Sequence, residues 1–111
     1  MLKDAFVTIM VKDMKKAVEF YTKKLGLKLS YESKYWSEIS APGMTIGLHI
    51  AKKVGSSDMS IGFTVTNLEK AMEKLKANGI KFAPVHDDEY VKFADFEDPD
   101  KNPFYIVEMK K

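Results

Sequence analysis

The 111-residue sequence contains no cysteine, no arginine and no glutamine. The absence of cysteine excludes disulfides, thiolate metal ligands and a cysteine nucleophile. All 18 basic residues are lysines, so no guanidinium group can hold a carboxylate or phosphate through two parallel hydrogen bonds. A highly anionic substrate is therefore disfavoured. No apolar run approaches the roughly 20 residues that a membrane-spanning helix requires.

The composition that remains is that of a small globular domain. Hydrophobic residues make up 45% of the chain and charged residues 31%, and the net charge of +2 is spread along the sequence. No basic stripe suggests a nucleic-acid or membrane surface. We therefore expect a single domain over residues 1–111, located in the cytoplasm, with neither nucleic acid nor membrane as a partner.

An internal repeat is the most informative pattern. The segment VKDMKKAVE at residues 11–19 returns as VTNLEKAME at residues 65–73, 54 positions later. After one skipped residue the similarity continues, because GLKL at 26–29 corresponds to GIKF at 79–82. Each half is too small to bury its own apolar face, so we expect two copies of one unit to pack together.

Both halves predict the same order of elements, namely a strand, a helix and three further strands. Asp13 is a good N-cap for the first helix, and Gly26 is expected to end that helix. Asn67 and Gly79 have the same roles in the second helix. The expected strands lie at residues 5–11, 27–32, 36–40, 44–51, 59–65, 80–83, 90–96 and 104–109. The fold class is therefore α+β, with two βαβββ modules forming a cupped mixed sheet and one helix per module on its convex face. The predicted boundaries are module one at 1–52, a linker at 53–57 and module two at 58–111.

Three segments give these elements a family resemblance. The first, VTIMVKDMKKAVEFYTKKLGLKL at 7–29, carries a V-x-D…FY…LG pattern, and GFTVTNLEKAMEKLKANGI at 62–80 repeats its helix. The third, FEDPDKNPFYIVE at 96–108, is similar to a D-P-D-G-N-x-x-E-x-x-E ending. Together they resemble the vicinal oxygen chelate superfamily, which includes glyoxalase I, extradiol dioxygenases and the bleomycin and fosfomycin resistance proteins.

The resemblance implies a homodimer whose concave sheet holds a divalent metal or an organic ligand. The metal-ligand positions of the family correspond to Phe6 and Ser60 in the first strand of each module, and to Gly47 and Tyr105 in the last. Divalent sites of this kind need imidazole and carboxylate ligands, which none of the four supplies. The sequence therefore predicts no metal and no cofactor, as in the bleomycin-resistance type.

Other residues offer weaker candidates for chemistry. His49 shares the strand face of Gly47 by alternation and could act in proton transfer, with Glu38 as the accompanying carboxylate. Glu108 has the opposite parity to Tyr105 and is expected toward the helix or the rim. The His86-Asp87-Asp88-Glu89 segment could hold a cation, but a solvated loop is the simpler interpretation.

The last turn departs from the family pattern at one position. Lys101 stands where the family usually has glycine, and a positive φ there would carry a strain of about 1 kcal/mol. Asp98 and Asp100 are expected to serve this turn through hydrogen bonds from side chain to backbone.

An aromatic surface with few polar groups is expected on the concave face. The predicted ligand-binding residues are Phe6, Thr8, Trp36, Glu38, Gly47, His49, Ser60, Thr64 and Tyr105, and the middle strands would add Ser40 in module one and Tyr90, Lys92, Ala94 and Phe96 in module two. Such a surface favours binding or sequestration of a small, partly aromatic molecule, with Trp36 and Tyr105 stacking on it. Two alternatives stay open. One is a metal-dependent or metal-free lyase, isomerase or dioxygenase of the same superfamily, and the other is a dimeric scaffold without ligand.

Overall fold

The computed structural model describes residues 5–55 and 59–110 and divides the chain into two compact units, Met1–Gly55 and Ser56–Lys111. These units are modules one and two of the repeat, and each is described by itself. Part of the predicted linker, residues 56 and 57, lies outside the described residues. In the part of the chain that the structure describes, no helix is long and apolar enough to cross a membrane.

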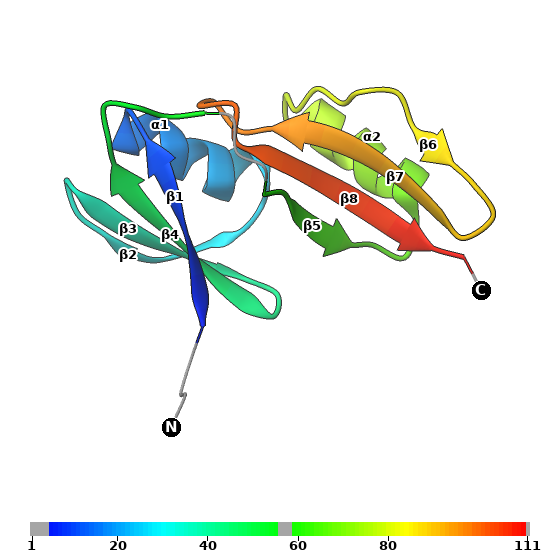
Figure 1. Ribbon diagram of the computed structural model, residues 1–111, viewed down its shortest axis with the longest axis horizontal. Coiled ribbons are helices and arrows are strands. Elements are labelled where there is room, and N and C mark those ends of the chain that lie inside the picture. Colours follow the sequence, from blue (N-terminus) through cyan, green and yellow to red (C-terminus); the bar gives the residue numbers. More distant parts are fainter. Residues whose placement is uncertain (1–4, 56–58, 111) are drawn as a thin grey trace. The chain divides into compact units, whose positions relative to one another are not determined.

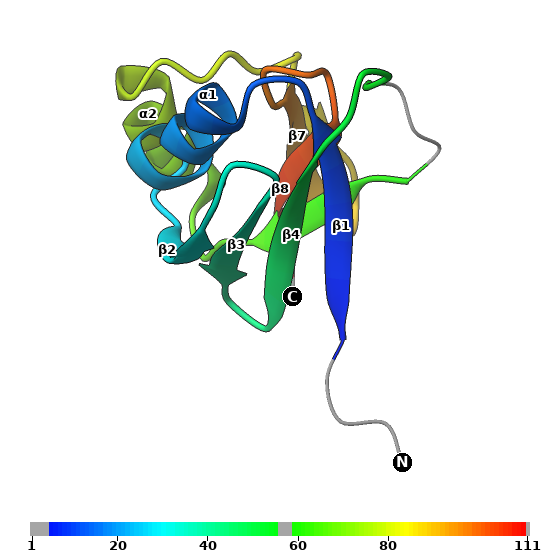
Figure 2. The ribbon, with the colours of Figure 1, turned by 90° about the vertical axis from the view of Figure 1, so that its left-hand side faces the viewer.

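Module one is a four-stranded mixed sheet with its helix packed on one face (Figures 1 and 2). The strands lie in the order β1-β4-β3-β2, and β1 runs parallel to β4 while the other pairs are antiparallel. Its elements are β1 (Phe6–Val11), α1 (Met14–Glu19), the π-helical segment η1 (Phe20–Lys24), β2 (Lys28–Glu32), β3 (Trp36–Ala41) and β4 (Met44–Ile50).

Module two repeats this topology with the strand order β5-β8-β7-β6, and β5 is parallel to β8. Its elements are β5 (Ile61–Thr64), α2 (Leu68–Ala77), β6 (His86–Asp87), β7 (Val91–Glu97) and β8 (Pro103–Met109). The α+β class and the βαβββ order of both modules are confirmed (Figure 1).

Both helices begin and end as the sequence predicts. The Asp13 carboxylate accepts a hydrogen bond from Lys16 N at 3.1 Å, and the Asn67 side chain accepts one from Lys70 N at 3.0 Å. These side chains satisfy amide groups that have no partner inside the helix. Gly26 and Gly79 follow the helices at φ values of 83° and 98°, where a residue with a Cβ would be strained.

The helix of module one contains a π-helical turn that its counterpart lacks. Six residues separate Glu19 from Gly26, whereas five separate Glu73 from Gly79. The additional residue is accommodated in η1, where the N–H of Leu25 donates to the carbonyl of Phe20, five residues earlier, at 2.9 Å. A π-helical turn adds one residue without ending the helix. The skipped residue of the repeat therefore has a structural explanation.

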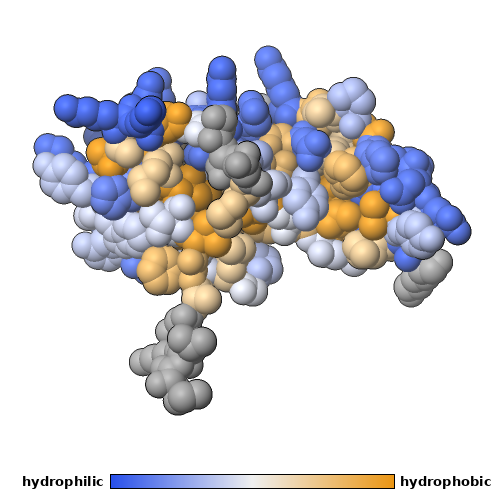
Figure 3. All heavy atoms as spheres, in the orientation of Figure 1, coloured by the Kyte–Doolittle hydropathy of each residue, from blue (hydrophilic) through white to orange (hydrophobic). Residues whose placement is uncertain are grey.

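Each module has its core between the sheet and the helix. In β1, Ile9 and Val11 are buried while Phe6, Thr8 and Met10 on the other face are exposed, which is the alternation of a strand with one covered face. In module two the rings of Phe96 and Phe104 stack in the core at 5.4 Å. On the face seen in Figure 3, hydrophilic residues project along the upper edge and hydrophobic residues gather below them.

The prediction for the face of the middle strand in module two is wrong. Ala94 and Phe96 are buried in the core, and Lys92 forms an ion pair with Glu69 of α2 at 3.1 Å, so these residues point to the helix side. Tyr90 precedes β7 and is exposed. The opposite face of β7 presents Phe93, Asp95 and Glu97. A shift of one residue in the assumed strand start reverses every side chain.

The predicted strand at residues 80–83 is also wrong. This segment has no regular structure, and the edge strand of module two is instead the two-residue β6, which pairs with β7. The predicted turn at the end of β7 is confirmed. Asp98 accepts hydrogen bonds from the backbone N–H groups of Asp100 and Asn102 at 2.9 and 2.8 Å, and Lys101 has a φ of 66°.

Candidate functional site

The face of the first sheet that points away from α1 carries most of the predicted ligand-binding residues. We call it the open face of module one. It comprises Phe6, Thr8 and Met10 from β1, Trp36, Glu38 and Ser40 from β3, and Thr45, Gly47 and His49 from β4. Strand register brings them into rows: Gly47 lies between Thr8 and Glu38, and His49 lies between Met10 and Trp36.

Trp36 lies directly on Gly47. A Cβ atom added to Gly47 would be 2.2 Å from Cη2 of the indole ring, which is closer than any real carbon contact. The indole Nε1 donates a hydrogen bond to Oε2 of Glu38 at 2.9 Å. The missing side chain of Gly47 therefore makes room for the ring, and Glu38 fixes its orientation.

Two further rings surround this indole. Phe6 and His49 meet it edge to face, with ring centroids at 6.2 and 6.3 Å. His49 is exposed, and its Nδ1 is 2.7 Å from the carbonyl oxygen of Ile50. Because a carbonyl only accepts, Nδ1 is the protonated nitrogen, and in the neutral ring Nε2 can accept a proton.

A hollow of about 750 Å³ opens beside the indole, at the end of the β3–β4 hairpin. Its lining consists of Ala5, Phe6, Trp36, Glu38, Ser40, Ala41, Gly43, Met44 and Thr45. Three predicted residues, Phe6, Trp36 and Glu38, are among them. The predicted Thr8, Gly47 and His49 share the face but not the lining.

Of the remaining residues of the hollow, Ser40 was expected on this face, and the others were not predicted as site residues. Met44 and Thr45 begin β4, while Ala41 and Gly43 belong to the hairpin. The short gap between the predicted strands at 36–40 and 44–51 was the signal that could have found them, because it marks a hairpin end close to Phe6, which pairs with Thr45.

Module two also has an aromatic ring that covers a glycine, but the ring and the glycine come from other strands than in module one. Tyr105 of β8 covers Gly62 of β5, its direct partner in the sheet, and a Cβ at Gly62 would be 2.2 Å from Cζ of the tyrosine. Phe93 meets the Tyr105 ring edge to face at 6.0 Å. The other predicted residues of this module, Ser60 and Thr64, are exposed.

The residues in the metal-ligand positions of the family do not fit a divalent metal. Phe6 has no donor atom, and Gly47 has no side chain and lies beneath Trp36. Ser60 and Tyr105 offer only neutral hydroxyl groups. Over residues 5–55 and 59–110, the structure brings no three His, Asp or Glu side chains together as a metal site.

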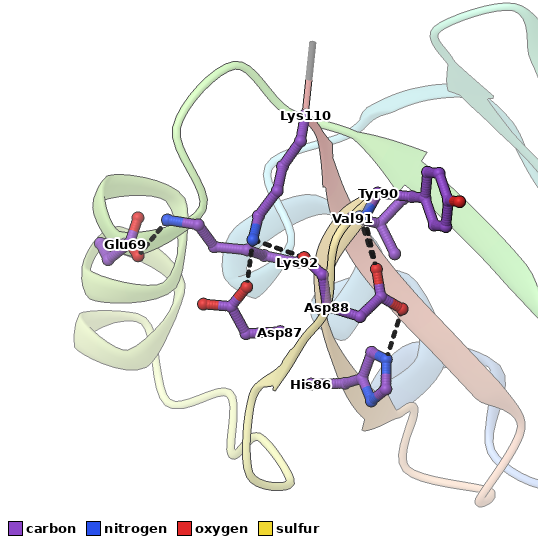
Figure 4. Close-up of polar contacts among 8 residues, drawn as sticks. All are labelled: Glu69, His86, Asp87, Asp88, Tyr90, Val91, Lys92 and Lys110. Atoms are coloured by element: carbon purple, nitrogen blue, oxygen red, sulfur yellow. Dashed lines mark hydrogen bonds and ion pairs between the residues drawn. The ribbon is translucent and has the colours of Figure 1, made fainter.

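The acidic segment after β6 forms a turn instead of a cation site (Figure 4). One oxygen of Asp88 accepts hydrogen bonds from the N–H groups of Tyr90 and Val91 at 2.7 and 2.9 Å, and the other lies 2.8 Å from Nε2 of His86. The Val91 N–H, His86 and the Tyr90 N–H together lower the pKa of Asp88 to about 2. Asp87 pairs with Lys110, and this hydrogen bond lowers the pKa of Asp87.

The other isolated candidate, Glu108, also has a structural role. Its Oε1 accepts the N–H of Leu68 at the start of α2 at 2.7 Å, as its predicted orientation toward the helix allows. A carboxylate at a helix N-terminus stabilises both the free amide and the helix dipole.

With this geometry established, the comparisons with known proteins identify the family. The chain matches the Glyoxalase/Bleomycin resistance protein/Dioxygenase superfamily over residues 5–106. The protein belongs to this superfamily. An uncharacterized Bacillus subtilis protein, YetH, is 31% identical over 113 aligned positions, which cover 92% of this chain and 94% of YetH.

Solved structures of low sequence identity share the fold. A glyoxalase family protein from Enterococcus faecalis has a TM-score of 0.82 at 20% identity, covering 96% of this chain and 97% of its own. TnmS3, an antibiotic binding protein from a Streptomyces species, has a TM-score of 0.79 at 16% identity, with coverages of 99% and 98%. At these identities the likeness concerns the fold alone.

Proposed function

We propose that this protein binds a small, partly aromatic organic molecule on the open face of module one, without a metal ion or other cofactor. The observation that carries the proposal is the indole of Trp36, seated on Gly47 and oriented by Glu38 beside a hollow of about 750 Å³. A ring that is already fixed loses little conformational freedom when a planar ligand stacks on it. The hollow is within the usual size range of small-molecule sites.

The chemistry of the face supports binding more than metal catalysis. The residues in the family's ligand positions provide neither imidazole nor carboxylate, whereas the face provides two aromatic rings, Phe6 and Trp36, and the hydroxyl groups of Ser40 and Thr45. The similarity in fold to TnmS3, which binds an antibiotic, is compatible with such a role.

Thermal-shift screening followed by isothermal titration tests the proposal. A ligand at 100 times its Kd stabilises the folded state by about 2.7 kcal/mol, which raises the Tm of a domain of this size by about 10 °C. We expect this shift from members of a panel of aromatic natural products. A panel that leaves the Tm unchanged would count against ligand binding and favour a scaffold.

A metal-free lyase or isomerase is the second candidate, because one observation favours it. The Ile50 carbonyl holds the proton of His49 on Nδ1, so that Nε2 of an exposed imidazole can accept a proton from a substrate, with Glu38 on the same face. Elemental analysis of protein purified without chelator distinguishes a metal-dependent version. A stoichiometric divalent ion that is lost in His49→Ala would overturn the metal-free proposal.

We further propose that the protein acts as a homodimer in the cytoplasm, with neither nucleic acid nor membrane as a partner. The support is the family's usual assembly together with a cysteine-free sequence of nearly balanced charge. Light scattering coupled to size-exclusion chromatography measures the assembly, and a mass near the monomer value of 12.6 kDa would refute the dimer.

A further inference from the structure

The hollow beside Trp36 differs in charge from the rest of the protein. The chain has 18 lysines and a net charge of +2. Among the described residues that line this hollow, however, Glu38 is the one charged side chain. A second hollow of module one, of about 520 Å³, is lined by Lys12, Lys15 and Lys34 together with Asp13 and Glu32. Three lysines of module one therefore line this second hollow, whereas Lys28 pairs with Ser40 on the neighbouring strand β2.

We propose that the ligand of this hollow carries a positive charge on or beside its aromatic ring system. This assignment rests on the proposed binding function and specifies its chemical class. The half-buried Glu38 carboxylate lies at the edge of the Trp36 ring and uses Oε2 to accept the indole N–H. An ionised carboxylate has about four lone-pair sites, so it retains capacity for an N–H donor of a cationic ligand.

The aromatic rings favour the same charge. The faces of Trp36 and Phe6 carry the negative part of their ring quadrupoles and attract cations. The indole N–H already donates to Glu38, which leaves it less available to an anionic or neutral acceptor. No described lining residue is a lysine, so an anionic ligand would meet the Glu38 carboxylate without a compensating cation among those residues.

Three acridines that share one ring system and differ in charge test the assignment. They are 9-aminoacridine as the cation, acridine as the neutral compound and acridine-9-carboxylate as the anionic one, titrated at pH 8 by calorimetry. A charge-assisted contact is about twice as strong as a neutral one. We therefore expect the cation to bind about tenfold more tightly than acridine, and the carboxylate to bind most weakly.

Glu38→Gln is the decisive variant, because the amide oxygen can still accept the indole N–H while the charge is removed. We expect it to weaken binding of 9-aminoacridine about tenfold and to change binding of acridine by less than about twofold. Glu32→Gln is the matched control, since it removes the same charge from a residue of the second hollow and should leave all three affinities unchanged. Higher salt should weaken binding of the cation by the unmodified protein.

The outcomes separate this assignment from the proposed function. Equal affinities for the three acridines, or a Glu38→Gln variant that keeps the preference for the cation, would overturn the charge assignment and leave aromatic binding intact. Binding of none of the three would overturn both. The salt dependence is measured on the unmodified protein and therefore decides the assignment even if Glu38→Gln fails to fold.

Discussion

The two modules share a topology and differ in what their sheets present. Each places an aromatic ring on a glycine, but module one takes the ring from β3 and the glycine from β4, whereas module two takes them from β8 and β5. In the first arrangement a carboxylate accepts a hydrogen bond from the ring, and a hollow of about 750 Å³ lies beside it. The two modules thus share a backbone topology, and the proposed site rests on residues of module one.

The register makes this difference concrete. Glu38 pairs with Gly47, and the corresponding pair in module two is Asp95 with Tyr105. His49 pairs with Met10, and the corresponding position beside Thr64 is Val107. Module two therefore lacks the imidazole of module one at the matching position and fills the place of Gly47 with a tyrosine.

Removal of the two rings should give the largest difference between the modules. We expect Trp36→Leu to weaken binding of an aromatic ligand at least about 30-fold, the loss typical of a central binding residue. Tyr105→Leu should weaken it by less than about threefold, because the proposed site lies in module one. Isothermal titration measures both, and circular dichroism controls for folding. Equal losses in the two variants would show that the modules contribute alike.

Replacement of Gly47 or Gly62 by alanine should lower the stability of the protein in both cases. Only the change at Gly47 should also alter the environment of the Trp36 indole. Gly47→Ala and Gly62→Ala each force a ring to move, and we expect each to destabilise the fold by about 1–3 kcal/mol. Gly47→Ala should also shift the fluorescence of Trp36, the single tryptophan of the chain. Urea unfolding measures the stability of both variants, and emission spectra report on the Trp36 ring. An unchanged spectrum in Gly47→Ala would contradict the contact between Trp36 and Gly47.

The contact between Glu108 and the start of α2 belongs to module two alone, because its counterpart in register, Ile50, cannot accept a hydrogen bond through its side chain. We expect Glu108→Ala to destabilise the protein by about 1–2 kcal/mol through the loss of a charged acceptor for Leu68 N. Urea unfolding measures the effect. Glu73→Ala, at an exposed helical position, serves as the control and should change stability by less than about 0.5 kcal/mol.

The smallest effect should come from the turn between β6 and β7, where Asp88 stands in the place that Ser33 has in the matching turn of module one. Folding lowers the pKa of Asp88 from its ordinary 3.8 to about 2, so the ionised carboxylate stabilises the folded state above pH 4. This contribution is lost as the pH falls from about 4 to about 2. Carboxyl chemical shifts followed by NMR should show a midpoint near 2 for Asp88. A midpoint near 3.8 would mean that the turn does not hold this side chain.

Much of the fold could be predicted because each signal was local. The N-caps Asp13 and Asn67 and the stops Gly26 and Gly79 act within one helical turn, and the structure places them as expected. The π-helical turn is also visible in the sequence, because the first copy of the repeat has one residue more than the second between the glutamate that the two copies share and the following glycine. The open face of module one was predictable because in β4 the apolar Ile46 and Leu48 alternate with Thr45, Gly47 and His49.

The wrong predictions concern features that neighbouring residues in the sequence do not determine, such as the buried face of a strand and the pairing register. Strand β7 has apolar residues on both faces, with Phe93 on one and Ala94 and Phe96 on the other, so its sequence does not show which face the helix covers. The seating of Trp36 on Gly47 depends on the pairing register of β3 and β4, which the sequence did not give directly. The hollow depends in turn on how the hairpin ends beside that ring.

Fluorescence titration of Trp36 tests the central claim most directly, because the chain contains one tryptophan and it lies in the proposed site. The account predicts that 9-aminoacridine quenches this emission along a saturable curve with one site per chain, and that Glu38→Gln shifts the midpoint about tenfold to higher concentration. Emission that changes only linearly with added compound, in the unmodified protein and the variant alike, would contradict it.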